Sequence, residues 1–542
     1  MAEAASAAEV VPAAERAHRS GRRRARASAW AGWTALAVLL GIAIARLSQQ
    51  IPLNSDQASS VLEGWAMGHG NPLLSGWTLP ADGFFTSKLP LLAVLERFQG
   101  LTPDAVYEVS GLLGAGVVIA AVWLAGGPHR GRTRALTMLV TGTLLASQVL
   151  LIPGAGNSFP AGAMLPAGTD HAATLLLLLI ACLALQGGRR TRVRLAVVWV
   201  ALAAASIGDP LAAVVGSGCL ALVAVLDLVL GGREGVRRDA VLFAIGASSA
   251  IAAPVAWWGI RRVGGFTAAP LLGGGYGLPS PVTSLGHNLA VGGHALLTVF
   301  GADILGQPNP LAAGSAVLHL CGLALVLAVL VWVLRPRHWL RLDLVSRVLT
   351  LGMLLDAAAY IVGQQATDLT SARYLVPLLG FGAVLAGREG VPRMLAARPR
   401  LALGLLALGA AYAGVLAAGA ITAQPAAPPL GAVTTWLSDH GATYGLATYW
   451  DANVVTVSTR GAVAVRAVQT ASDAVEPFHW HSTTSWYDPG SHRATFILLP
   501  GDDATDRTAI EAALGTPTEI RTVGGTTIML WPGNLLSDLS SP

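Results

Sequence analysis

The stretch that decides the fold is 29–56, AWAGWTALAVLLGIAIARLSQQIPLNSD. Its first twenty residues, 29–48, are almost all apolar and are long enough to cross the hydrocarbon core of a bilayer as a helix. The polar residues that follow end this span and place Asp56 a few residues beyond the membrane edge. The chain therefore begins its ordered part as a membrane protein with an acidic residue just outside the first span.

The composition extends this conclusion to the whole chain. Of 542 residues, 53% are hydrophobic and only 12% are charged, whereas a soluble protein carries about a quarter charged residues. The net charge of +5 comes from arginine clusters between apolar spans, so it indicates membrane orientation and not nucleic-acid binding. Three scattered cysteines inside apolar spans, Cys182, Cys219 and Cys321, are expected to be packing residues.

Apolar length and helix breakers predict a polytopic α-helical membrane protein with about eleven transmembrane helices. A cytoplasmic N-terminus places 24 of the 35 Lys and Arg residues on the inner side. The 49–104 loop, the 260–310 loop and everything after 421 then lie outside the cytoplasm of a multi-pass plasma-membrane protein. The expected spans are 29–48, 105–126, 134–153, 169–187, 195–208, 211–230, 239–259, 311–334, 347–364, 372–387 and 400–421.

The two ends of the chain differ from this transmembrane domain, 29–421. Residues 1–28, rich in Ala and Arg, are expected to form a disordered cytoplasmic tail. Residues 422–430 contain three prolines and are expected to be a linker. The rest, 431–542, predicts a small extracytoplasmic α/β domain. Its expected elements are an amphipathic helix at 431–440, strands at 444–450, 462–468, 494–499, 519–523 and 526–531, and a helix at 506–514.

The first outer loop, 49–104, is too long and too patterned to be a simple connection. Two amphipathic helices are expected, at 56–67 after an Asn54-Ser55 cap and at 87–98. Helices of this kind directly after a span lie on the membrane surface. Asp56 would then stand at a helix start.

An acid just past the first span, a long loop with surface helices, many spans and a C-terminal outer domain together resemble the GT-C membrane glycosyltransferases. The chain is similar to the protein O-mannosyltransferase and aminoarabinose transferase type. The segments 71–77 (NPLLSGW), 84–87 (FFTS), 372–377 (ARYLVP) and 449–453 (YWDAN) resemble those of actinobacterial members. Many relatives pair two acids in this loop, whereas here Asp56 is followed by Gln57.

The resemblance implies transfer of a sugar from a polyprenyl-phosphate-linked donor to an extracytoplasmic protein, glycan or lipid. Asp56 would be the general base that takes the proton of the acceptor. The alternative for Asp56 is a helix N-terminal carboxylate favoured by the helix dipole. The departing lipid phosphate needs positive charge.

Other residues were weighed as substrate-binding groups. Arg373 stands at the outer start of a span and suits a lipid phosphate, although a snorkelling arginine has the same pattern. Lys88, the only lysine, suits phosphate contact or a solvated helix end. Glu63, two helical turns after Asp56, suits contact with an acceptor, although a solvated helix face explains it as well. Asp82 suits a second acid that binds substrate or helps to hold a divalent metal, but its Asp-Gly pair favours a turn. His171 follows Asp170 at the outer start of the fourth span, where it would border the same cavity if the bundle closes around the first loop.

Alternative functions stay open at this point. Asp356 lies within the ninth span, where an acid is costly, and would suit a transporter or a flippase for lipid-linked precursors as well as a buried structural role. A non-catalytic envelope protein is the third alternative. His479 and His481 resemble a metal-ligand pair only loosely, so no metal ligand is assigned, and dependence on a divalent metal is left open.

Overall fold

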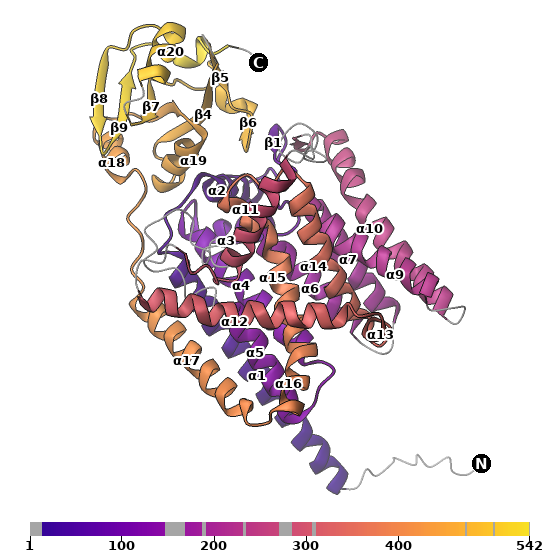
Figure 1. Ribbon diagram of the computed structural model, residues 1–542. Helices are drawn as coiled ribbons and strands as arrows, with labels where there is room; N and C mark the ends of the chain where they lie inside the picture. The colour runs from indigo at the N-terminus through magenta and orange to yellow at the C-terminus, as the bar shows by residue number, and fades with distance from the viewer. Residues whose placement is uncertain are drawn as a thin grey trace, which may run out of the picture.

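The computed structural model describes residues 13–146, 169–186, 191–230, 235–269, 284–305, 310–471, 474–501 and 504–540. Figure 1 shows a bundle of helices with a β-containing unit at one end, opposite the N-terminal helix. The main bundle helices are α1 (Ala13–Ser48), α4 (Asp104–Gly126), α5 (Gly131–Ala146), α6 (Thr169–Leu185), α7 (Arg192–Gly208), α9 (Cys219–Leu230), α10 (Val236–Arg262), α12 (Pro310–Val333), α14 (Leu344–Val362), α15 (Val376–Leu385) and α17 (Leu401–Thr422).

The apolar helices make the chain a multi-pass membrane protein. Within the described residues, eight helices are long and apolar enough to cross a membrane, and His171–Leu185 is a shorter apolar helix. Helices also occupy the other expected spans, but α7 has 17 residues and the described part of α5 ends at Ala146. The rest of the expected 134–153 span lies outside the described residues. The predicted count of eleven is therefore not confirmed.

One expectation about the connecting segments was wrong, and one helix was not foreseen. Helix α1 begins at Ala13, so residues 13–28, predicted to be disordered, are helical. Ala and Arg are strong helix formers, and a membrane span that follows directly supplies the helix nucleus. The 260–310 loop contains a further helix, α11 (Leu285–Val299). Its glycines and histidines interrupt the repeat of apolar residues that would indicate a helix.

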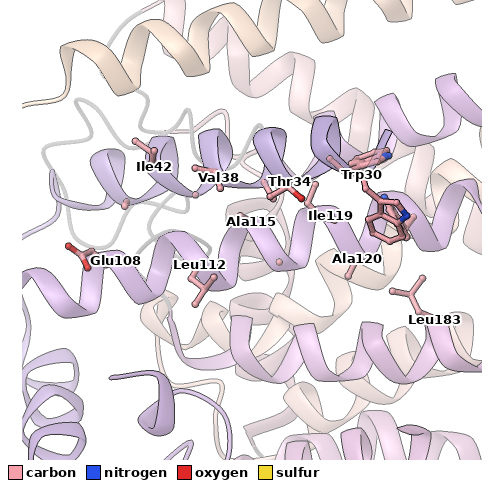
Figure 2. Close-up of a pocket in the computed structure, with 16 residues that line it drawn as sticks. Trp30, Thr34, Val38, Ile42, Glu108, Leu112, Ala115, Ile119, Ala120 and Leu183 are labelled. Atoms are coloured by element: carbon pink, nitrogen blue, oxygen red, sulfur yellow. The ribbon is translucent and has the colours of Figure 1, made fainter. Parts of the chain in front are cut away.

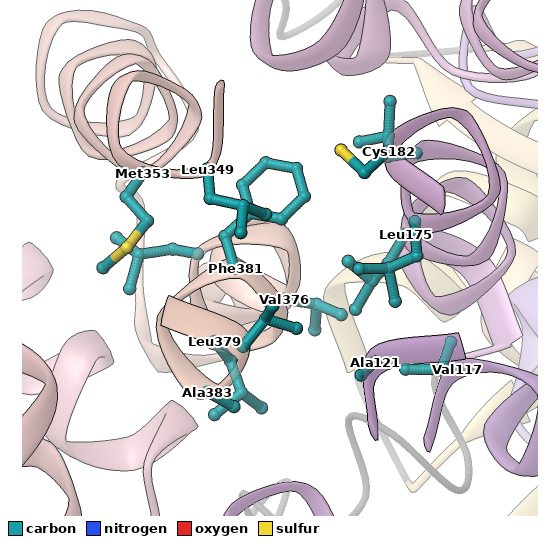
Figure 3. Packing of buried hydrophobic residues seen from close by; sticks show 14 of the residues in the cluster. Val117, Ala121, Leu175, Cys182, Leu349, Met353, Val376, Leu379, Phe381 and Ala383 are labelled. Carbon is teal, nitrogen blue, oxygen red and sulfur yellow. The ribbon is translucent and has the colours of Figure 1, made fainter. Parts of the chain in front are cut away.

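Helix α15 is the centre of the bundle. All ten of its residues are buried, and it contacts α4, α5, α6, α12 and α14. Figure 3 shows Phe381 of α15 beside Leu349 and Met353 of α14. A Cβ on Gly352 would lie 2.6 Å from the Phe381 ring, so the glycine permits this close approach. The segment that enters α15 is therefore held rigidly.

The C-terminal unit contains a six-stranded sheet in the order β5-β4-β3-β7-β9-β8. Strand β3 pairs parallel with β4 and β7, and the outer pairs are antiparallel. The strands are β3 (Tyr444–Ala447), β4 (Ala464–Ala471), β5 (Ala474–Pro477), β7 (Phe496–Pro500), β8 (Glu519–Val523) and β9 (Thr526–Leu530), accompanied by α18 (Gly431–Asp439), α19 (Tyr449–Ser458) and α20 (Ala504–Leu514). The strand expected at 444–450 is shorter than predicted, because α19 begins at Tyr449 to make the crossover between β3 and β4.

A second, three-stranded sheet joins the two parts of the molecule. Strand β1 (Trp77–Leu79) from the first loop lies between β2 (Thr267–Ala268), which follows α10, and β6 (Ser482–Thr483) from the C-terminal unit. The pairing is parallel with β2 and antiparallel with β6. Backbone hydrogen bonds thus fix the C-terminal unit to the end of the bundle.

Candidate functional site

Asp56 lies in the first turn of α2 (Ser55–Gly68). The Asn54 side chain accepts a hydrogen bond from the Gln57 amide at 2.9 Å, and the Gln57 side chain accepts one from the Asn54 amide at 3.2 Å. This capping box satisfies two helix N-terminal donors. It explains why Gln57 stands beside the acid, and it leaves the Asp56 carboxylate directed away from the cap and toward other elements.

The Asp56 carboxylate connects three segments that are far apart in the sequence. The Tyr449 hydroxyl, at the start of α19, donates to Oδ1 at 2.6 Å. Nη1 of Arg373, in the 3-10 helix η6 (Leu369–Leu375) before α15, lies 3.3 Å from Oδ2. The Asp56 side chain is 26% exposed and that of Arg373 is 33% exposed. A carboxylate with a fixed donor, a neighbouring cation and access from outside suits proton transfer.

The packing of α19 on α2 places Tyr449. The Asn453 amide nitrogen donates to the Ser59 hydroxyl at 2.9 Å, and the Ser55 hydroxyl donates to the Tyr449 carbonyl oxygen. Burial and the negative charge of Asp56 raise the pKa of Tyr449 well above 10. The phenol therefore stays protonated near neutrality and remains a hydrogen-bond donor to Asp56.

Glu63 forms a buried ion pair with the C-terminal unit. Its Oε1 lies 2.5 Å from Nδ1 of His481, and the side chains are 0% and 9% exposed. Burial lowers the pKa of His481, but the charge of Glu63 and the hydrogen bond to it outweigh this effect, so the net pKa lies above 6.5. Oε2 of Glu63 is buried without a hydrogen-bond partner among the described residues.

Lys88 is buried at the start of α3 (Leu89–Gln99), with Nζ 5.0 Å from the centre of the Phe84 ring. Its positive charge lowers the pKa of His481, which places it near the Glu63–His481 pair. The same Phe84 ring meets the His171 ring edge-to-face at 5.5 Å. The Phe84 ring thus contacts Lys88 and also His171, which belongs to a second group of polar residues.

That second group is centred on Asp209, between α7 and α8 (Pro210–Ala212). Nδ1 of His171 lies 2.8 Å from its Oδ2, and the Thr174 hydroxyl donates to the same oxygen at 2.7 Å. The ring of Tyr374, next to Arg373, lies 4.8 Å from that of His171. His171 is therefore linked to the Asp56 group through aromatic rings.

Two further acids have local roles in the structure. Asp82 lies in the turn after β1, as its Asp-Gly pair favours. Asp356 accepts a hydrogen bond at Oδ2 from the Leu378 amide at 2.8 Å, in the first turn of α15. Asp356 therefore satisfies one of the amide groups that a helix start leaves without a partner.

Comparison with solved structures identifies this architecture. ArnT from Cupriavidus metallidurans in the apo state matches with a TM-score of 0.53 and 12% identity, over 94% of this chain and 99% of that chain. Its structure bound to undecaprenyl phosphate matches with a TM-score of 0.52 and 11% identity over the same shares. The chain has the GT-C fold.

The other comparisons add no argument for the fold. The Archaeoglobus fulgidus oligosaccharyltransferase in complex with Zn and sulfate has a TM-score of 0.46 and 11% identity, over 85% of this chain and 67% of that chain. No family model matches the sequence, and no curated protein matches it. The relationship is therefore visible in the GT-C fold and not in the sequence as a whole.

Sequence reasoning missed Tyr449 and His481 as members of the site that this GT-C fold assembles. Tyr449 was noted within the segment 449–453, but it was expected to end a strand. His481 was considered only as one of a loosely resembling metal-ligand pair, yet it is buried, has a positive φ of 51° and contacts Glu63. His479 instead lies edge-to-face on Tyr487, so the two imidazoles do not form a pair. In the described ranges, no three His, Cys, Asp or Glu side chains gather as a metal site would require.

An apolar groove follows the GT-C bundle along α1 and α4 (Figure 2). It has a volume of about 680 Å³, with Trp30, Val38 and Ile42 on one side and Leu112 and Ile119 on the other. Its surface is predominantly apolar, so it can hold a hydrocarbon chain.

Proposed function

We propose that the chain is a membrane glycosyltransferase that moves a sugar from a polyprenyl-phosphate-linked donor to an acceptor. The observation that carries the proposal is the Asp56 carboxylate, held by Tyr449 and Arg373 where the bundle meets the C-terminal unit. The GT-C fold supports it, as does the match with ArnT bound to undecaprenyl phosphate. The positive-inside pattern of the arginines supports an orientation in which this end of the bundle, and hence the acceptor, is outside the cytoplasm.

In the proposed reaction an acceptor hydroxyl attacks the anomeric carbon of the donor. Asp56 takes the hydroxyl proton as the new carbon–oxygen bond forms, and the bond from the anomeric carbon to the phosphate oxygen breaks. The lipid phosphate leaves with the electron pair of that bond. Tyr449 orients the carboxylate, because its hydroxyl donates to the oxygen that Arg373 does not contact.

Arg373 and Lys88 are the proposed phosphate-binding groups. Arg373 precedes the fully buried helix α15, and α11 packs against the same segment, so the backbone that carries Arg373 is held in place. Cations fixed beside a leaving phosphate stabilise the charge that develops in the transition state. Glu63 and His481 are proposed to hold the C-terminal unit over the site, and His171 to support the floor of the site from Asp209.

The transporter alternative rested on Asp356. Because one oxygen of its carboxylate accepts a hydrogen bond from the Leu378 amide at the start of α15, a structural role is supported. We therefore favour glycosyl transfer over transport and over a non-catalytic role in the envelope.

The test measures transfer of radiolabelled sugar from polyprenyl-phosphate donors to membrane acceptors. Membranes would contain the wild type, Asp56→Asn or the matched control Asp104→Asn, at equal expression. Asp104 is an exposed acid at the start of α4 in the same region of the chain. We expect transfer by the wild type and the control, and loss of at least ~100-fold with Asp56→Asn. Full activity of Asp56→Asn in a folded protein would remove the base from the proposal.

A further inference from the structure

A second cavity lies between α2, β1 and the C-terminal sheet. Its volume is about 370 Å³, within the range of about 300–1,000 Å³ that small-ligand sites occupy. Leu62 and Trp65 of α2 line it, as does Arg466 of β4. These α2 residues follow Asp56 by six and nine positions, which is roughly 9 to 14 Å along the helix axis. Nine residues are about two and a half helical turns, so the cavity lies on another side of α2 from Asp56, at a separation that a short oligosaccharide can span.

The lining combines flat aromatic rings with small polar groups. The three tryptophans come from different segments, and the rings of Trp77 and Trp486 meet edge-to-face at 5.0 Å. Hydroxyl and amide groups also line the cavity. They belong to Asn71, Ser75, Thr456, Thr483 and Ser485. A sugar ring presents apolar C–H faces and polar hydroxyl edges, so this lining matches it.

Arg466 adds a charge that the protein does not balance. Its Nε donates to the Tyr444 hydroxyl at 3.3 Å, and its guanidinium lies 4.0 Å from the centre of the Trp486 ring. Nη1 is buried without a hydrogen-bond partner among the described residues. No acidic side chain of the described chain lines the cavity or forms an ion pair with Arg466. Arg466 is half-buried and lines the cavity, so a ligand in the cavity can supply the anion that this guanidinium lacks among the described residues.

We propose that this cavity binds an anionic saccharide unit, one that carries a carboxylate or a phosphate group, as part of the acceptor. The identification of the ligand as acceptor rests on the proposed function, whereas the binding itself does not. The guanidinium pairs with the anionic group, and the indole rings contact the faces of the sugar. The cavity thereby selects acceptors by charge at a distance from the reacting hydroxyl.

The test measures binding of free sugars to the purified full-length protein in detergent by calorimetry. The probes are glucuronic acid, glucose 6-phosphate and glucose, which separate carboxylate, phosphate and neutral ligands. We expect at least one anionic sugar to bind about tenfold or more tightly than glucose. Arg466→Met should abolish that preference, whereas Arg521→Met, which removes an exposed arginine on β8, should leave it unchanged.

A second variant protects the test against misfolding. Ser485 is exposed at the rim of the cavity, so Ser485→Trp fills the cavity and leaves Arg466 in place. We expect it to weaken binding of the anionic sugar at least tenfold. Equal binding of glucose and both anionic sugars, or unchanged binding by Ser485→Trp and Arg466→Met, would overturn the inference.

The two proposals fail separately. A protein that transfers sugar but shows no preference for the anionic probes retains the proposed function and refutes the inference. A protein that prefers the anionic probes but transfers no sugar from any donor retains the binding site and counts against glycosyl transfer. Loss of transfer with retained binding in Asp56→Asn supports both.

Discussion

The Glu63–His481 pair should control how tightly the C-terminal unit is held on the bundle. Both side chains are almost fully buried, and they come from the two parts of the molecule. Removing one partner of a buried ion pair costs about 3–5 kcal/mol, because the other charge is left uncompensated. Without Glu63 the buried imidazole loses its proton more easily, so the full cost applies only at low pH, where His481 stays charged. There, at about 3 kcal/mol, Glu63→Gln raises the population of the undocked state roughly 150-fold. In the double variant Glu63→Gln/His481→Gln neither charge remains, so we expect a smaller effect than with either single change.

The assay is maleimide labelling of a cysteine at Val457. Val457 of α19 is 0% exposed in the cluster that packs α19 on α2, so its labelling rate follows the undocked population. The three natural cysteines are in apolar helices, and the exposed one, Cys321, is replaced by serine in the background. Labelling of Glu63→Gln at the same rate as the parent would refute the reasoning. A double variant that destabilised docking by the sum of the two single changes would also refute it.

The same assay has a pH dependence of fixed sign. The docked pKa of His481 lies above its ordinary value of 6.5. A histidine of this kind stabilises the docked state fully below about pH 6.5, and the stabilisation is lost as the pH rises through the raised pKa. After correction for thiol ionisation, labelling should increase above neutral pH in the parent. His481→Gln should remove this increase.

Three further predictions concern single residues. Tyr449→Phe removes a hydrogen bond to a charged group, worth about 1.5–3 kcal/mol, so we expect transfer to fall roughly 10- to 150-fold with a changed pH profile; an unchanged profile would exclude a positioning role. Arg373→Met should raise the KM for the lipid-phosphate donor more than the KM for the acceptor, and equal effects on both would contradict phosphate binding. Burial raises the pKa of Glu96 to about 9. Glu96 therefore lowers the free energy of unfolding increasingly as the pH rises above 4.5, because the unfolded chain ionises this carboxyl more easily than the folded protein does. Glu96→Gln should therefore raise the melting temperature at pH 8 but not at pH 4, and a loss at pH 8 would show that the carboxyl is needed.

The sequence was sufficient for the parts of the fold that local pattern determines. Helix α2, its Asn54 cap and most C-terminal strands follow from hydrophobic period and capping residues, which act within a few positions of the chain. Helix α11 was not recognised, because its apolar positions are interrupted by residues of low helix propensity and its stability comes from packing against η6 and α14.

The candidate site was only half visible for a related reason. Asp56 and Arg373 stand at element boundaries next to apolar spans, where position alone makes a charged residue notable. Tyr449 and His481 reach the site only through the docking of α19 and β6, which depends on contacts across about 400 residues of chain. No local pattern reports such a contact.

The three-stranded sheet has a consequence for how the protein is made. Its middle strand, β1, emerges from the ribosome early, whereas β6 emerges roughly 400 residues later and must find the free edge of β1 across the finished bundle. At synthesis rates of about 5–20 residues per second, Tyr449 and His481 are made on the order of half a minute after α2, which carries Asp56 and Glu63. A partly translated chain therefore holds Asp56 without Tyr449, and the proposed catalytic site is complete only when the last part of the polypeptide has been made.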